Sequence, residues 1–234
     1  MASMVTSKRI PVLVAATILS LSGRRSVGEE LPLSELLSRM DSFYSSSPGI
    51  TADFEQTLES RTLNRPIQEN GNVSLKPPGR MRWEYLKPRG KLAITDGVRA
   101  YLYLPDDEQV FVGRIQDLDR GAVASGLLLG TASLRRDFNV EGELLGDEGE
   151  RWLLKLTPRV PDFPYDSVTL EVEQRSGAIR RIVLLDPLGN RVEYRFNHLR
   201  VVHNLPDRLF AYRIPKGVDV QVLREEPGVS ASPP

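Results

Sequence analysis

The chain has 234 residues, with 31 Lys and Arg against 31 Asp and Glu, two His and no Cys. This length suits one large or two small domains and allows a sizeable hydrophobic core. A net charge of zero argues against a protein that binds nucleic acid by neutralising phosphates. The absence of Cys excludes disulfides, thiol nucleophiles, Cys-ligated zinc and Fe–S clusters.

The first residues have the pattern of a secretory signal. Lys8 and Arg9 precede an apolar run over residues 10–21, which is shorter than the roughly 20 residues of a membrane-spanning helix. The small residues Ser26 and Gly28 predict cleavage just before Glu29, and an uncleaved membrane anchor is the alternative.

Cleavage after residue 28 changes the charge of the chain. The segment 1–28 contains four basic residues and no acidic one, so its removal leaves a net charge of −4. We expect residues 1–28 to be the signal peptide and residues 29–226 to form the exported domain. Residues 227–234 are mostly Pro, Gly, Ser and Ala and are predicted to be a disordered tail.

One amphipathic helix is predicted near the start of the exported domain. Its apolar side chains recur at i, i+3, i+4, i+7 and i+10, and they are Leu33, Leu36, Leu37, Met40 and Phe43. Ser34 is the candidate N-cap, and the Ser, Pro and Gly residues at 45–49 end the helix.

The pattern then changes to the two-residue period of β-strands. Met81, Trp83 and Tyr85 alternate with Arg82 and Glu84, which predicts a strand with one apolar face. Further strands are predicted at 50–58, 71–76, 91–95, 98–104, 109–112, 138–142, 151–156, 167–172, 179–185 and 191–196, with a last one at 209–214.

The interruption of this pattern at residues 118–134 is rich in Gly, Ala and Leu and predicts one or two short helices. About eleven strands joined by tight turns predict a single antiparallel sheet, which at that size tends to curl. The fold class expected is therefore mainly β: an unclosed half-barrel covered by helical pieces.

The sequence contains few candidates for catalysis. His198 and His203 are five residues apart with no acidic cluster beside them, and acidic pairs such as Asp106 and Asp107 lie in predicted turns. No phosphate-binding loop, dinucleotide fingerprint or nucleophile elbow is present. We therefore expect a binding or carrier protein rather than an enzyme, without a metal or cofactor.

A curled sheet with an apolar inner face can hold a ligand. The candidates for that face are the apolar and aromatic residues of the strands, namely Phe54, Met81, Trp83, Tyr85, Leu92, Ile94, Tyr101, Tyr103 and Phe138. The alternative is that these side chains only pack together beneath the helix.

Several motifs resemble the LolA family of periplasmic outer-membrane lipoprotein carriers, in order and spacing, over about residues 33–220. They include the early helix, the segment Ala52–Gln56, and the stretch from Leu75 to Tyr85 with its Pro-Gly-Arg-Met-Arg-Trp-Glu-Tyr sequence. Ile94-Thr-Asp-Gly, Tyr101-Leu-Tyr, Leu127-Leu-Leu-Gly and Phe138-Asn-Val follow.

The resemblance implies an unclosed half-barrel with a helical lid that shields the acyl chains of lipoproteins. It implies acceptance of cargo from an inner-membrane ABC-type lipoprotein release complex and delivery to an outer-membrane lipoprotein receptor, by a periplasmic monomer. The lid residues expected on this basis are Leu36, Met40, Phe43, Leu127, Leu128 and Leu129. The alternative function is a non-enzymatic binder or sensor of another amphiphile, such as a glycolipid or fatty acid, on the same fold.

The sequence departs from the family at Pro77. Family members carry a basic residue directly before the Pro of this stretch, and that residue bonds to the lid. Pro77 has neither a side-chain donor nor an N–H. Lys76 and Arg80 are therefore the possible polar contacts to the lid, unless the lid is held by packing alone.

Overall fold

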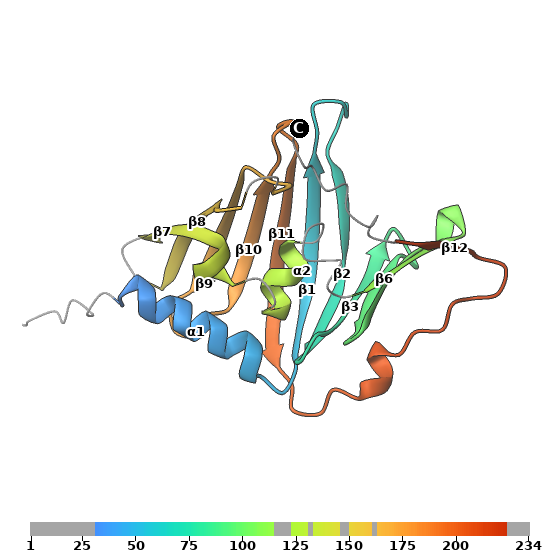
Figure 1. Ribbon diagram of the computed structural model, residues 1–234, viewed down its shortest axis with the longest axis horizontal. Helices are drawn as coiled ribbons and strands as arrows, with labels where there is room; N and C mark the ends of the chain where they lie inside the picture. The colour runs from blue at the N-terminus through green and yellow to red at the C-terminus, as the bar shows by residue number, and fades with distance from the viewer. Residues whose placement is uncertain (1–30, 115–122, 131–132, 146–149, 161–162, 224–234) are drawn as a thin grey trace, which may run out of the picture. The chain divides into compact units, whose positions relative to one another are not determined.

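The structure is a computed structural model that describes residues 31–114, 123–130, 133–145, 150–160 and 163–223. The predicted signal peptide at 1–28 and the predicted tail at 227–234 lie outside these ranges, as do residues 118–122 of the segment predicted to be helical. Within the described ranges, twelve strands form one open sheet, and the α-helices lie on one face of it (Figure 1).

The predicted strands up to residue 196 and the predicted helices are present in the predicted order. The α-helices are α1 (Leu33–Ser46), α2 (Val123–Leu129) and α3 (Leu134–Asp137), and the 3₁₀ helices are η1 (Pro105–Asp107) and η3 (Asp207–Phe210). The strands are β1 (Ile50–Glu59), β2 (Ile67–Lys76), β3 (Arg80–Lys87), β4 (Leu92–Asp96), β5 (Arg99–Leu104), β6 (Gln109–Arg114), β7 (Phe138–Leu145), β8 (Arg151–Pro158), β9 (Ser167–Glu173), β10 (Ile179–Leu185), β11 (Arg191–Val201) and β12 (Asp219–Val222).

The strand order in the sheet is β12-β6-β5-β4-β3-β2-β1-β11-β10-β9-β8-β7. Consecutive strands pair antiparallel, except that β6 does not pair with β7 and β11 does not pair with β12. β1 pairs with β11, from Ile50 opposite Val201 to Glu59 opposite Arg191, and this ladder joins the two halves of the sheet. β12 pairs parallel with β6. The half-barrel with a helical cover is therefore confirmed.

The two faces of the sheet differ in character. On β3, Met81, Trp83 and Tyr85 are buried, whereas Glu84 is exposed and Arg82 is half-buried. The same alternation on β8, β9 and β10 places their buried Leu, Val and Ile side chains in one hydrophobic core with α1 and α2. We call the face that carries this core the inner face (Figure 1).

Two glycines permit close packing at this face. A Cβ added to Gly71 on β2 would lie 2.0 Å from the Glu84 carbonyl oxygen and 2.9 Å from the Phe54 ring. Gly177, in the β9–β10 turn with a φ of +77°, approaches the backbone of α1 so closely that a Cβ would lie 2.6 Å from the Met40 nitrogen. Side chains at these positions would separate β2 from β3, and the turn from α1.

Two local predictions are wrong. The helix begins at Leu33 after Pro32, so Ser34 is not its N-cap, and no side chain caps it. Residues 209–214 do not form a strand: η3 ends at Phe210, and the chain continues without regular structure to β12. Phe210 is 1% exposed, so burial of its ring accounts for the apolar residues that suggested a strand there.

Candidate functional site

The centre of the inner face is an aromatic cluster from β3, β1 and β11, with Gly71 of β2 between the β3 and β1 rings. The Phe54 ring on β1 makes edge contacts with Trp83 at 4.6 Å and Tyr85 at 4.9 Å between centroids, both on β3. On β11, Tyr194 and Phe196 lie 5.6 Å and 5.9 Å from Trp83. These rings come together because directly opposite residues in the ladders share a face.

Two helices cover the inner face. α1 contributes Leu36, Leu37, Met40 and Tyr44, which are all buried. α2 contributes Leu127 and Leu128, at 5% and 3% exposure, in the same core as the aromatic cluster. The remaining predicted lid residues, Phe43 and Leu129, are only partly buried but pack against this core.

Of the predicted inner-face residues, five lie on this face. Phe54, Met81, Trp83, Tyr85 and Phe138 are all buried in the core that α1 and α2 share. Phe138 lies apart from the aromatic cluster, at the start of β7, with Phe163 against it at 5.3 Å between ring centroids. The inner face is therefore apolar from β3 across to β7.

The prediction is wrong for the other residues of the set. Ile94 is opposite Arg82, and Leu92 is opposite Glu84, so both lie on the outer face. Tyr101 and Tyr103 pair with them in turn. Thr95 and Ala93, which are opposite Met81 and Trp83, take the inner positions instead. The turn between β3 and β4 sets the register, and apolar side chains on both faces of β4 and β5 conceal it in the sequence.

The outer face of β3–β6 is covered by the last part of the chain. Leu205 and Phe210 are buried, as are Ile94 and Val110. The ring of Tyr212 lies 5.3 Å from that of Tyr101. η3 contacts both β3 and β4. We call residues 202–223 the C-terminal segment.

Among the described residues, Lys76 and Arg80 bind the C-terminal segment, and no contact of either with α1 or α2 is present. Lys76 Nζ donates to the Leu205 carbonyl at 2.6 Å, and both side chains contact the Asp207 carboxylate, Arg80 at 2.7 Å. Lys76 and Arg80 lower the pKa of Asp207 below its usual range. The predicted polar contacts therefore exist with a different partner, because alternation along β2 and β3 aims these side chains at the outer face.

Two further features of the inner face were not predicted. The hydroxyl of Tyr44 accepts a hydrogen bond from the Ile179 N–H at 2.9 Å, and burial raises its pKa. Tyr44 lies seven residues after Leu37, so the helical period of the sequence indicates that it shares the buried side of α1. Lys91 and Glu69 form an ion pair at 2.8 Å beside Tyr85. No local pattern joins these two residues, since they lie 22 apart on separate elements.

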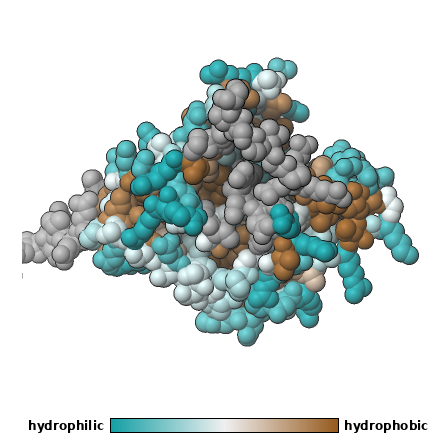
Figure 2. All heavy atoms as spheres, viewed as in Figure 1, coloured by the Kyte–Doolittle hydropathy of each residue, from teal (hydrophilic) through white to brown (hydrophobic). Residues whose placement is uncertain are grey.

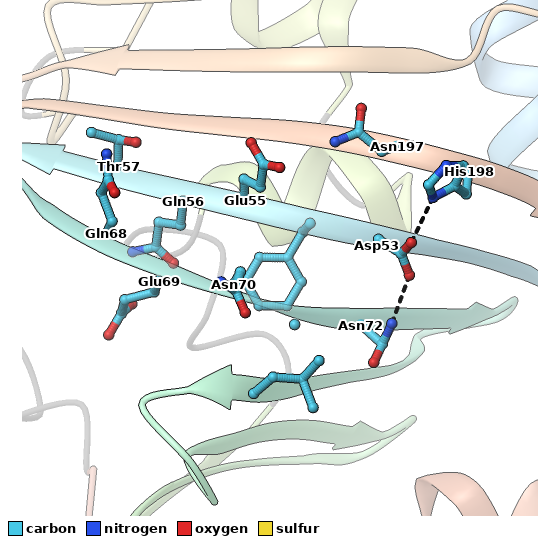
Figure 3. A pocket seen from close by; sticks show the side chains of 13 residues that line it. Asp53, Glu55, Gln56, Thr57, Gln68, Glu69, Asn70, Asn72, Asn197 and His198 are labelled. Atoms are coloured by element: carbon cyan, nitrogen blue, oxygen red, sulfur yellow. Dashed lines mark hydrogen bonds and ion pairs between the residues drawn. The ribbon is translucent and has the colours of Figure 1, made fainter.

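The outer face of β1, β2 and β11 carries a polar groove of about 600 Å³ (Figure 3). Asp53 lies there between His198 and Asn72, accepting from Asn72 Nδ2 at 2.7 Å and lying 2.7 Å from His198 Nδ1. The His198 interaction lowers the Asp53 pKa, as does that with Asn72. His198 is therefore a hydrogen-bonded surface residue, as predicted, and most of the residues that line the groove are polar or charged.

Further charges on the outer face are paired with one another. Glu193 binds Arg181 at 2.9 Å and Arg195 at 2.6 Å and also contacts Arg191. Burial opposes its ionisation, but Arg181 and Arg191 outweigh that effect and lower its pKa to about 2. Within the described ranges, no group of three His, Asp or Glu side chains is arranged to bind a metal ion.

Apolar side chains are also visible beyond the covered core. Figure 2 shows apolar atoms at the end of the sheet where β6 and β12 lie, and Val220 and Val222 of β12 are exposed there. In the part of the chain that the structure describes, no helix is long and apolar enough to cross a membrane. The arrangement is thus an open sheet with an apolar face under two helices, suited to burying alkyl chains.

This arrangement is that of a carrier with a covered apolar face, and the comparisons with known proteins agree. The chain matches the model of the outer membrane lipoprotein carrier protein LolA over residues 45–213 and belongs to that family.

Individual relatives give the same result. The chain is 32% identical over 186 residues to the outer-membrane lipoprotein carrier protein of Methylococcus capsulatus, covering 78% of this chain and 86% of the relative. It is 29% identical over 184 residues to that of Dechloromonas aromatica, covering 78% and 85%. A crystal structure of an uncharacterised conserved protein from Thermus thermophilus shares the fold, with a TM-score of 0.53, 18% identity, and coverage of 81% and 98%.

Proposed function

We propose that this protein is a non-enzymatic periplasmic carrier that shields the acyl chains of lipoproteins between the inner face of the sheet and the helices α1 and α2. The observation that carries the proposal is the hydrophobic core on the inner face, which extends from β3 to β7 and is covered by helices, in a member of the LolA family. The names of the relatives support lipoprotein cargo.

The cavity wall in this proposal consists of Phe54, Met81, Trp83, Tyr85 and Phe138. Each residue lies on the inner face, whereas Ile94, Tyr101 and Tyr103 do not. The lid consists of α2 with Leu127, Leu128 and Leu129, together with Leu36, Met40 and Phe43 of α1. Cargo would enter by displacing the side chains of α2 from the wall.

The free energy gained by burying acyl chains explains why the lid helix α2 is short. Burying a methylene is worth about 0.8 kcal/mol, so an acyl chain with a dozen buried methylenes gains on the order of 10 kcal/mol. A carrier that kept the whole gain would not release its cargo. Displacement of Leu127 and Leu128 exposes apolar surface of the protein itself, which offsets part of the gain and leaves the cargo exchangeable.

The route of the cargo follows from the same proposal. The carrier accepts lipoproteins from an inner-membrane ABC-type release complex and delivers them to an outer-membrane lipoprotein receptor, working as a monomer in the periplasm. Residues 1–28 direct its export and are then removed, and the carrier domain lies within residues 29–226.

The test is retention of a synthetic peptide with a triacylated N-terminal Cys. The wild-type protein should retain it and should not bind the same peptide without acyl chains. Leu128→Asp should shorten the half-time of transfer to acceptor vesicles by at least about tenfold, because an unpaired carboxylate cannot be buried against the apolar wall. Leu188→Asp, at a side chain that is 74% exposed, is the matched control and should behave like wild type.

Hydrogen exchange provides a second measurement on the same samples. Loading with the acylated peptide should change exchange in α2 and leave β9, an interior strand between β8 and β10, unchanged. Failure of the wild-type protein to distinguish acylated from unacylated peptide would refute the carrier function. Native mass spectrometry of protein from the periplasm identifies the natural ligand, and free lipid in place of lipoprotein would favour the amphiphile sensor.

A further inference from the structure

A row of polar side chains crosses the inner face at one end of the aromatic cluster. Gln56 on β1 is opposite Glu69 on β2 and opposite Tyr194 on β11, so the three side chains lie on the same face. Lys91, just before β4, donates from Nζ to both Glu69 carboxylate oxygens at 2.8 Å. We call Gln56, Glu69, Lys91 and Tyr194 the polar row.

Tyr85 connects the polar row to the apolar wall. Its hydroxyl donates to Gln56 Oε1 at 3.1 Å, and Lys91 Nζ lies 4.2 Å from the centre of its ring. The Tyr85 ring also packs edge-on against Phe54 of the aromatic cluster. A ligand with alkyl chains on Phe54 and Trp83 would therefore place its polar head at the Glu69–Lys91 pair.

The charges of Glu69 and Lys91 largely compensate each other, so the pair attracts a charged head group only weakly. The Glu69 and Lys91 side chains are only 13% and 19% exposed, and both carboxylate oxygens already accept from Lys91. A head group made of esters and amides can lie beside this neutral pair at no electrostatic cost. A phosphate would face the Glu69 carboxylate and could reach Lys91 only by breaking the pair, which leaves Glu69 as an uncompensated, largely buried charge.

The apolar wall cannot make this distinction. Lipoproteins and phospholipids both carry long acyl chains, and apolar contacts discriminate weakly between chains of similar length. Selection between the two classes has to come from the polar head. We infer that the Glu69–Lys91 pair is a specificity determinant that excludes phosphate-bearing lipids from the inner face and admits the uncharged ester and amide head of a lipoprotein. This inference rests on the proposed carrier function.

The test compares two soluble lipids that differ in the phosphate-bearing head, dioctanoylglycerol and dioctanoylphosphatidylglycerol, with the triacylated peptide as reference. Glu69→Gln frees Lys91, and the variant should bind the phosphatidylglycerol about tenfold more tightly relative to dioctanoylglycerol and the peptide. Lys91→Gln leaves an unpaired carboxylate and should weaken phosphatidylglycerol binding below the wild-type level.

Further variants separate selectivity from folding. The reversed pair, Glu69→Lys with Lys91→Glu, should restore the wild-type preference. Glu84→Gln removes a carboxylate that pairs with Arg82 on the outer face at 3.0 Å and should change none of the affinities. Opposite changes in the two single variants cannot arise from partial unfolding, which would weaken binding of every ligand.

The possible results are distinct. Equal effects of Glu69→Gln and Lys91→Gln on phosphatidylglycerol, or no effect of either in folded protein, would overturn the assignment of specificity to this pair. If the wild-type protein did not bind the triacylated peptide, the carrier function would fail, irrespective of how the variants rank the two lipids.

Discussion

The two halves of the sheet bury their residues in different ways. From β7 to β11 the strands are covered on the inner face, by α1 and α2, and their outer face carries ion pairs such as those around Glu193. From β3 to β6 the outer face is also covered, by the C-terminal segment with Leu205 and Phe210. β9 therefore alternates strictly between apolar and polar residues, whereas β4 and β5 have apolar residues at both parities.

This difference shows which apolar surface is available for a ligand. In the β3–β6 half, the outer apolar residues are held against a segment of the same chain and have a structural partner. The inner face is covered by α2, a helix of seven residues that is too short to be stable without its packing. A ligand can compete with such a cover more easily than with a segment that buries Leu205 and the Phe210 ring against the sheet.

The largest loss of stability is expected from Phe210→Ala, in the half of the sheet whose outer face is covered. The ring is 1% exposed, so its removal should lower the free energy of unfolding by about 3–5 kcal/mol, as measured by urea denaturation. Phe43→Ala on α1, at a half-buried ring, is the control and should cost less. The acylated peptide should still bind to Phe210→Ala, and loss of that binding in folded protein would contradict a purely structural role for the outer face.

A smaller loss in the free energy of unfolding is expected from Glu193→Gln in the other half of the sheet. The charged hydrogen bonds to Arg181 and Arg195 should make the substitution cost about 1–3 kcal/mol at neutral pH. Glu143→Gln, at an exposed residue of β7, serves as the control.

The same variant predicts a pH dependence. The folded pKa of Glu193 is about 2, below the ordinary 4.5, so its contribution is fully present above about pH 4.5 and is lost as the pH falls toward 2. Stability curves of wild type and Glu193→Gln should therefore converge over that interval. Parallel curves from pH 5 to pH 2 would show that the outer-face pairs do not stabilise the fold.

The smallest effect is expected from Lys76→Ala and Arg80→Ala. Both residues bind the C-terminal segment at an exposed carboxylate, and exposed ion pairs add little to stability. Neither variant should change the half-time of transfer from the loaded protein to acceptor vesicles. A transport defect in Arg80→Ala as severe as that in Leu128→Asp would show that the polar contact acts on the lid after all.

Much of this protein was determined by local sequence. The spacing from Leu36 to Met40 dictates which side of α1 is buried, and alternation dictates that Trp83 and Glu84 face opposite ways. These outcomes depend on the helical and strand periods, which act within a few residues. The LolA resemblance likewise rests on motifs that are contiguous in the chain.

The tertiary structure decided which face of the sheet each strand residue occupies and which remote residue it contacts. Ile94, Tyr101 and Tyr103 are as apolar as Trp83, and only the register of β3 with β4 places them on the other face. The partner of Lys76 and Arg80 is more than 120 residues away, at Asp207. Glu69 and Lys91 also meet only through strand pairing. A side chain's identity fixes what it can bind, but its partner depends on distances that arise when remote segments pack together.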